Sequence, residues 1–169
     1  PYDQLSPELK ASLTEYYKVN TLESLDEKIR AIGYFIHRYG KIDWLESNNE
    51  YWLESDAKLR TEFNITTGMM VDHINDFKEK SAMKAFYEKA GVPTARYHLV
   101  QGQEDAKAFI EKVGYPVVVK PDNGVGAAAT YKLRSDADLE NFLASKIDVQ
   151  YIMEEFVNGT IETYDGIVD

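Results

Sequence analysis

Residues 115–130 read YPVVVKPDNGVGAAAT and carry the strongest structural signal in the chain. Residues 117–119 are three consecutive valines, and such a run of β-branched residues predicts a short buried strand. Lys120 stands at the tip of this strand, where Pro121 lacks the N–H needed to continue it simply. After a turn, residues 130–133 (TYKL) alternate again. The stretch therefore predicts two antiparallel strands joined by a glycine-rich hairpin.

The hairpin loop has the composition of a phosphate-binding loop. Gly124 and Gly126 leave little side chain in the way, so backbone N–H groups can approach an anion closely. We expect Lys120 to face these glycines and add a positive charge. Glycine-rich hairpins that bind no ligand are also common, and the loop by itself leaves both interpretations open.

A dinucleotide-binding fingerprint is the rival interpretation of the same loop. Residues 124–129 (GVGAAA) fit the G-x-G-x-x-G/A pattern of NAD- and FAD-binding domains. That pattern needs a strand that runs directly into the glycines and a helix that follows them. Here KPDN intervenes and residues 130–133 look like a strand, so this hypothesis ranks second.

Composition and charge narrow the class of protein. The chain has 169 residues, of which 44% are hydrophobic and 12% aromatic, which is enough to bury a core. The sequence contains no run of 18 apolar residues and no basic–apolar leader, which argues against a membrane partner. Cysteine is absent, and this excludes disulfides, thiol catalysis and cysteine metal sites. A formal net charge of −10 argues against a nucleic-acid partner.

The two ends of the sequence suggest part of a longer protein. The chain begins at Pro1 rather than at methionine, and it ends within residues 161–168, which read as an unfinished strand. We therefore expect a fragment.

Residues 1–68 predict helices around one strand. One helix follows the cap Ser6, another runs from the Ser24 capping box to Gly40, and a third opens at Asn48 or Asn49. Residues 41–45, with Trp44 as a core residue, read as a strand, which suggests part of an α/β layer. A helical interaction domain that docks a partner through exposed aromatic residues is the alternative for this region.

Residues 70–157 predict alternating helices and strands. Residues 70–90 are helical with a break near 76–79, and the apolar stripe of this helix is expected to be core. Its members are Met83, Phe86, Tyr87 and Ala90. Further strands are expected at residues 97–100 and 151–157, and helices are expected to end at Gly114 and to begin at Ser135 or Asp136. The three histidines are too far apart in the sequence to suggest a metal site.

Three features occur in a characteristic order. Lys80 begins a helix that ends in AGVP (90–93), the YPVVVKP strand and its glycine loop come next, and MEEFVNGTIE (153–162) follows as strand, turn and strand. Together they resemble the ATP-grasp superfamily, in particular the branch that contains biotin carboxylase and the carbamoyl-phosphate synthetase large subunit. The resemblance covers residues of about 70–169.

The resemblance implies an α/β fold in two parts. Residues 1–69 would be a partial pre-ATP-grasp layer of Rossmann type, although its glycine-rich first βα turn is not recognisable. Residues 70–169 would be the N-terminal lobe of the ATP-grasp fold, α+β with an antiparallel sheet and incomplete at the C-terminus.

The resemblance also assigns phosphate contacts. Lys80 matches a lysine that reaches nucleotide phosphates, and Lys120 matches one that contacts the α and β phosphates. Gly124 and Gly126 lie in the loop that closes over them. The family often has serine and glycine where this chain has Ala127 and Ala129, which puts loop closure in doubt. An ordinary solvated lysine is the simpler explanation for Lys80 taken alone.

The resemblance assigns residues 154–157, the hinge segment between the two lobes, to the base of the nucleotide, and it assigns Glu162 to the sugar. Glu154 matches a glutamate that meets the adenine amino group, and Glu155 and Phe156 match positions that present backbone groups to the base. Val157 matches a residue that packs nearby, and Glu162 one that holds the ribose hydroxyls. Without the resemblance, these glutamates would read as charges on an exposed strand edge.

The resemblance implies an ATP-dependent ligase that phosphorylates a carboxylate or bicarbonate for attack by an amine or another nucleophile. It implies ATP and Mg²⁺ as cofactors, with the metal ligands beyond residue 169 and neither a catalytic nor a metal-binding residue in this chain. The intact parent would be cytoplasmic, with a homodimer possible, and the fragment alone inactive. A catalytically silent nucleotide-binding module stays open as an alternative.

Overall fold

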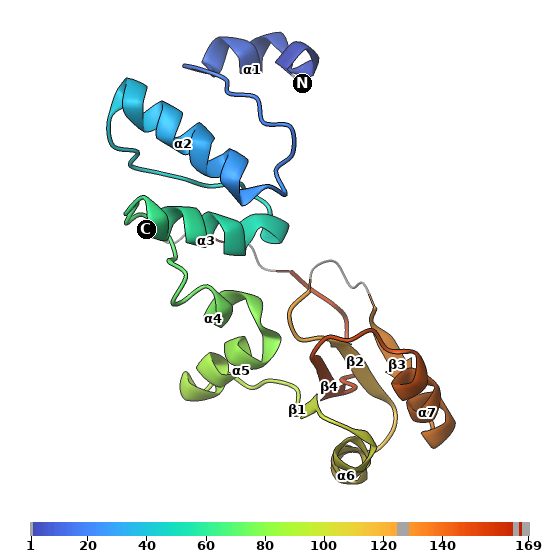
Figure 1. Cartoon of the computed structure of the whole chain (residues 1–169). Helices are drawn as coiled ribbons and strands as arrows, with labels where there is room; N and C mark the ends of the chain where they lie inside the picture. Colours follow the sequence, from blue (N-terminus) through green and yellow to red (C-terminus); the bar gives the residue numbers. More distant parts are fainter. Residues whose placement is uncertain (1, 125–128, 164–165, 167–169) are drawn as a thin grey trace. The chain divides into compact units, whose positions relative to one another are not determined.

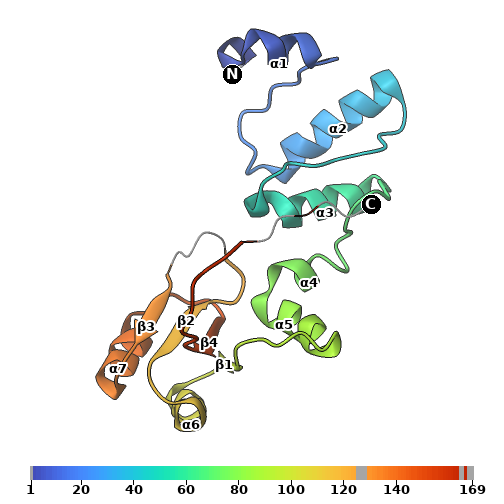
Figure 2. The same cartoon turned by 180° about the vertical axis from the view of Figure 1, so that it is seen from behind.

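The computed structural model describes residues 2–124, 129–163 and 166. The chain divides into two compact units, residues 1–75 and residues 76–169 (Figures 1 and 2).

Helices make up the regular structure of residues 2–75. The short 3₁₀ helix η1 (Tyr2–Gln4) precedes α1 (Pro7–Ser12), and α2 spans Leu25–Tyr39. Ser6 and Ser24 cap α1 and α2, because each side chain accepts a hydrogen bond from the backbone N–H three residues on, at 3.2 Å. Gly40, with φ of 85°, ends α2. The predicted caps and the predicted end are confirmed.

The third helix is held by a buried arginine. It consists of η2 (Glu50–Trp52) and α3 (Leu53–Glu62). Arg60 on α3 is 2% exposed and donates to the backbone oxygens of Leu45 at 3.1 Å and Met69 at 2.9 Å. Its guanidinium also pairs with Glu46 at 3.2 Å.

The strand predicted at residues 41–45 is wrong. No strand occurs among residues 2–75, so no partner exists for it, and the Leu45 carbonyl accepts from Arg60 instead. Trp44 is 65% exposed and is therefore not a core residue. The α/β layer that this strand suggested is not found in this part of the chain.

Two helices open the second unit. Helix α4 (Asn75–Lys78) begins at the unit boundary, and α5 spans Lys80–Lys89. The predicted break between them is confirmed at Glu79, which has extended backbone and forms a β-bridge with Asn123. The apolar stripe of α5 is not core, because Phe86 is 51% exposed and Tyr87 is 47% exposed.

The second unit is built on a four-stranded antiparallel sheet. Its strands are β1 (Tyr97–Val100), β2 (Val117–Pro121), β3 (Tyr131–Leu133) and β4 (Tyr151–Glu155), in the spatial order β1-β4-β2-β3. The antiparallel pairing of β2 with β3 confirms the predicted hairpin strands. Described residues 156–163 form no strand, so the continuation predicted near Ile161 is not found there.

The core of this unit lies on one face of the sheet. Helices α6 (Gln103–Val113) and α7 (Asp136–Ser145) pack there, beside the sheet in Figures 1 and 2. Strand alternation sends every second side chain to this face. The buried cluster comprises Val100, Ala106, Phe109, Ile110, Val117, Val119, Leu133, Leu139, Phe142, Tyr151 and Met153. The opposite face therefore carries Val118, Lys120, Lys132, Ile152 and Glu154.

Candidate functional site

Strand register brings Lys120 and Glu154 together on the face opposite α6 and α7. Lys120 pairs across the strands with Ile152, and Glu154 pairs with Val118, so the two charged residues are diagonal neighbours. Lys120 Nζ lies 2.6 Å from Glu154 Oε2. The lysine at the strand tip thus forms an ion pair with the hinge glutamate.

A second lysine reaches the same carboxylate from α5. Lys84 Nζ lies 3.0 Å from Glu154 Oε1 and donates to the Ala95 carbonyl oxygen, also at 3.0 Å. It also lies 5.4 Å from the centroid of the Tyr97 ring, within cation–π range. Each oxygen of Glu154 is therefore taken by a different lysine. The sequence does not single out Lys84, because a lone lysine on a helix forms no recognisable pattern.

The environment keeps Glu154 ionised. Burial by itself raises the pKa of this carboxyl, but hydrogen bonds and charge from Lys120 and Lys84 outweigh burial and lower the pKa below its usual value. Two ammonium groups around one carboxylate leave a net positive charge. Such a cluster suits an anionic ligand.

Lys132 extends the positive face. It lies opposite Val118 on β3, so it shares the sheet face of Lys120. Lys132 Nζ lies 3.3 Å from the centroid of the Phe156 ring, which places this hinge residue under a cation. Nothing in the sequence distinguished Lys132 from an ordinary strand lysine.

Lys80 contacts the start of the glycine loop. Its Nζ donates to the carbonyl oxygens of Asp122 at 3.2 Å and Gly124 at 3.0 Å, and its backbone N–H donates to Asp122 O at 3.1 Å. We expected Lys120 to face these glycines. Among described residues the lysine that does so is Lys80, whereas Lys120 points to Glu154.

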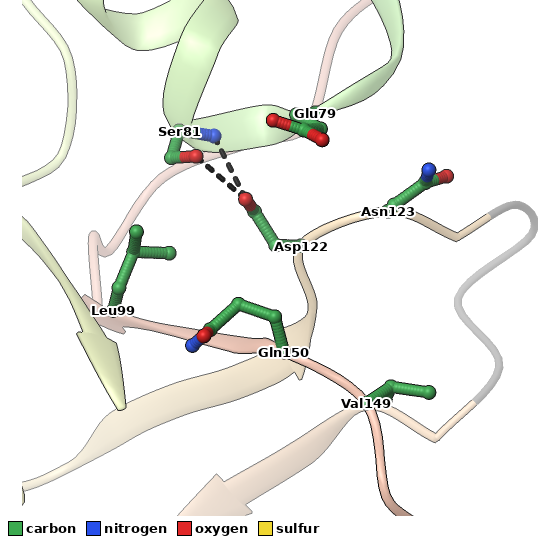
Figure 3. A pocket seen from close by; sticks show the side chains of 7 residues that line it. All are labelled: Glu79, Ser81, Leu99, Asp122, Asn123, Val149 and Gln150. Carbon is green, nitrogen blue, oxygen red and sulfur yellow. Dashed lines mark hydrogen bonds between the residues drawn. The ribbon is translucent and has the colours of Figure 1, made fainter. Parts of the chain in front are cut away.

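Asp122 ties the loop to the first turn of α5. Its buried carboxylate accepts from the Ser81 N–H at 2.8 Å and from the Ser81 hydroxyl at 2.6 Å, as the dashed lines in Figure 3 show. It therefore serves as an N-cap supplied from a distant part of the sequence. The sequence indicated only a turn residue here, because a cap that acts across 41 positions leaves no local pattern.

Gly124 and Ala129 border the part of the loop that is not described. A Cβ at Gly124 would lie 3.2 Å from the Pro121 Cβ, so glycine relieves a close approach. Ala129 has φ of 52°, in the left-handed region that glycine favours. Gly126 and Ala127 lie outside the described residues.

The rest of the hinge is more exposed. Glu155 binds Arg96, with Oε1 accepting from the backbone N–H at 2.8 Å and Oε2 from Nε at 2.7 Å. The Glu155 N–H donates to Arg96 O at 3.0 Å and is not free for another acceptor. Val157 and Glu162 are exposed, and Glu162 lies in a segment without a strand. The structure brings Lys120, Glu154 and the base of the loop to one sheet face but leaves Glu162 outside these contacts.

A cavity of about 510 Å³ with a mixed polar and apolar lining lies at the base of the loop (Figure 3). It is lined by Glu79, Ser81, Leu99, Asp122, Asn123, Val149 and Gln150. The cavity adjoins the Asp122 cap and does not include Lys120 or Glu154. No sequence pattern predicts this cavity, because its lining comes from segments that are distant in the chain.

Within residues 2–124, 129–163 and 166, no three His, Asp or Glu side chains are placed to hold a metal ion. Over the same residues, no helix has the length and apolar character to cross a bilayer.

Comparison with known proteins agrees with this geometry. Residues 85–164 match the model of the ATP-grasp domain. The chain is 27% identical over 103 residues to the carbamoyl phosphate synthase large chain of Methanothermobacter thermautotrophicus, covering 58% of this chain and 10% of that protein. It is 39% identical over 88 residues to the phosphoribosylamine–glycine ligase of Streptococcus pneumoniae, covering 47% of this chain and 21% of that protein.

Solved structures share the fold. The biotin carboxylase domain of Hydrogenobacter thermophilus 2-oxoglutarate carboxylase, a dimer in complex with MgADP, ADP and bicarbonate, superposes with a TM-score of 0.63 at 22% identity. The match covers 81% of this chain and 33% of that chain, so it extends into residues 1–75.

The dinucleotide-binding hypothesis is not supported. Its fingerprint requires a helix after the glycines, whereas the described residues after the loop lead into β3.

The chain spans between 10% and 28% of the length of the curated relatives compared with it. The antiparallel sheet, the order of the motifs and the matched segment agree, and residues 85–164 of this chain belong to the ATP-grasp superfamily.

Proposed function

We propose that residues 76–169 are the nucleotide-binding part of an ATP-grasp ligase. The observation that carries this proposal is the cluster of Lys84, Lys120 and Glu154 on the sheet face opposite the helical core. It places net positive charge on one sheet face of the segment that matches the ATP-grasp domain, and Lys120 is the more exposed of its two lysines. The triphosphate of ATP carries the complementary charge.

Each site residue takes a role that its position allows. Lys120 turns from Glu154 to the α and β phosphates, and Lys80 supports the loop that contains Gly124 and Gly126 over them. The adenine base lies near Phe156 and Val157, where backbone groups that follow Glu155 form hydrogen bonds with it. Glu162 binds the ribose once the segment after the hinge pairs with a further strand. Glu154 serves the base less directly than the resemblance implies, because lysines take both of its oxygens.

The parent protein would use MgATP to phosphorylate a carboxylate or bicarbonate, and an amine or other nucleophile would then displace the phosphate. ATP supplies the phosphoryl group and Mg²⁺ neutralises its charge. This chain contributes binding, orientation and charge stabilisation rather than a covalent nucleophile. The Mg²⁺ ligands would come from residues beyond 169.

The relatives support the wider context of this proposal. The solved neighbour described above is a dimer with MgADP and bicarbonate, which is consistent with a small carboxylate or bicarbonate substrate and a homodimeric parent. Residues 1–69 precede the nucleotide lobe as a pre-ATP-grasp domain would, and the solved neighbour's match extends into them. A cytoplasmic parent belongs to the same proposal.

Calorimetric titration of the full-length parent with ATP tests the proposal. Lys120→Ala should weaken ATP binding at least about tenfold, or about 1.4 kcal/mol, because it removes a charge from the phosphate site. Affinity equal to that of the parent would remove Lys120 from the site. Tight NAD(H) binding without ATP affinity would reject the function itself.

A catalytically silent nucleotide-binding module is the second candidate, since it would use the same lysine cluster to bind ATP without turning it over. Formation of ADP by the full-length protein with a carboxylate or bicarbonate supplied would exclude it. ATP binding without any turnover across such substrates would favour it.

A further inference from the structure

Glu154 is shared by two lysines that differ in how firmly they are held. Lys84 is 11% exposed and has three partners, which are the Glu154 carboxylate, the Ala95 carbonyl oxygen and the Tyr97 ring. Lys120 is 27% exposed, and its described ion-pair partner is Glu154. Lys84 is therefore the fixed cation of the pair, and Lys120 is the one more accessible to a ligand.

Burial of Glu154 makes the fixed lysine necessary. The side chain of Glu154 is 10% exposed, and a carboxylate in such a place is strongly destabilising when it loses all of its cationic partners. If Lys120 were the only counter-ion, its transfer to a phosphate would leave the carboxylate unpaired. A second lysine on the other oxygen removes this conflict.

We propose that Lys84 is a positioning residue that holds Glu154 and thereby frees Lys120 to bind the nucleotide phosphates. Lys84 acts through Glu154 and does not touch the nucleotide. This inference rests on the proposed function and adds to it a residue from α5, outside the hairpin and the hinge.

Binding of inorganic tripolyphosphate to the full chain tests the proposal, because this probe reports the phosphate site without the base. Lys84→Met should weaken binding about tenfold. Lys89→Met is the matched control, since it removes the same charge from an exposed position on the same helix. Equal affinities of these two variants would overturn the proposal.

A double-variant cycle separates an indirect role from a direct contact. In a Glu154→Gln background, Lys84→Met should change tripolyphosphate affinity by less than about twofold, because no carboxylate then holds Lys120. The same tenfold loss in both backgrounds would mean that Lys84 itself contacts the anion, which would overturn the proposal.

The pH dependence gives a readout that a purely structural role would not move. Among the described residues, Lys84 of α5 and Lys120 of β2 contact the Glu154 carboxylate, and Tyr97 of β1 is its cross-strand neighbour. Burial, followed by the charges of Glu88 and Asp122, raises the pKa of Tyr97, so this residue stays neutral below its usual pKa. In the Lys84→Met variant, only Lys120 remains to oppose the effect of burial, so the pKa of Glu154 should be higher than in the parent. As the pH falls, Glu154 becomes protonated and no longer holds Lys120.

The difference in tripolyphosphate affinity between Lys84→Met and Lys89→Met should therefore be smaller at about pH 5.5 than at about pH 7. Measuring both variants at each pH cancels the titration of the probe. A gap that stays constant over this range would contradict the proposal.

Failure to fold is also informative. If Lys84→Met unfolds, the Lys84→Met/Glu154→Gln protein should regain the lost thermal stability, because the unpaired carboxylate is gone. No recovery would assign Lys84 a packing role through Ala95 and Tyr97 and would overturn the inference.

Absence of ATP binding by the parent would overturn the proposed function and this inference together. ATP binding with an insensitive Lys84→Met would overturn the inference alone.

Discussion

At the residue scale, Lys120 and Lys80 show what local sequence determines. The alternation of β2 places Lys120 on the face opposite the core. The strand runs one residue beyond the predicted tip, because Pro121 still pairs with Tyr151. The partner of Lys120 depends on the register between β2 and β4, which no single strand encodes. For this reason the expected contact of Lys120 with the glycines is not found. Lys120 forms an ion pair with Glu154, and Lys80 contacts Gly124 instead.

Glu154→Gln should destabilise the protein by about 3 kcal/mol at neutral pH, since it leaves two lysines close together without their carboxylate. The folded-state pKa of Glu154 lies below its usual value, so the stability that its charge contributes is present above the unfolded pKa. That contribution is lost as the pH falls through the folded pKa. The difference between parent and variant in urea unfolding should therefore shrink toward acid pH.

Glu155→Gln is the matched control for this measurement. Glu155 is adjacent and also paired, but its partner Arg96 is exposed, so the same change should destabilise the protein much less than Glu154→Gln at neutral pH. Equal losses for the two variants, or a Glu154→Gln effect independent of pH, would reject the buried ion cluster as a source of stability.

At the element scale, local signals predict most helices and strands of the second unit. The valine run, the Ser135 cap and Gly114 at the end of α6 each act within a few residues, and each is found where expected. The strand predicted at residues 41–45 fails because a strand also needs a neighbour. A buried arginine on α3 takes that segment's carbonyl instead.

Helix α5 departs from its own hydrophobic pattern. Its stripe of Met83, Phe86 and Tyr87 predicts an apolar face against the core, yet α5 directs Lys84 to the sheet. The buried Glu154 carboxylate is stable only beside a cation, and this tertiary contact cannot be predicted from the periodicity of the helix. Phe86 and Tyr87 are consequently exposed.

Phe86→Ala should change the free energy of unfolding by less than about 1 kcal/mol, because half of this side chain already faces solvent. Phe142→Ala makes the same change at a position of α7 that is 3% exposed, and it should cost about 3–5 kcal/mol. Urea unfolding of both variants beside the parent measures the difference. Comparable losses would restore the α5 stripe to the core.

At the scale of the whole molecule, the order of three weak motifs predicted the superfamily. No single motif did so, since the glycine loop alone also fitted a dinucleotide fingerprint. Order along the chain is a global property that survives when each local pattern is ambiguous. The loop cap by Asp122 and the cation Lys84 escaped prediction because both act between segments that are distant in the sequence.

The charge of the whole chain and that of the site have opposite signs, and this contrast predicts ligand selection. A net charge of −10 repels an extended polyanion over its full length, whereas ATP needs only the local cluster of lysines. At physiological salt we expect ATP to bind, and we expect a labelled DNA duplex and a single-stranded RNA to show no binding by fluorescence anisotropy. Raising the salt should weaken ATP binding only modestly, because the cluster is partly buried and poorly screened. Nucleic-acid binding comparable to that of ATP would mean that a basic surface outside the described contacts dominates, contrary to the charge argument.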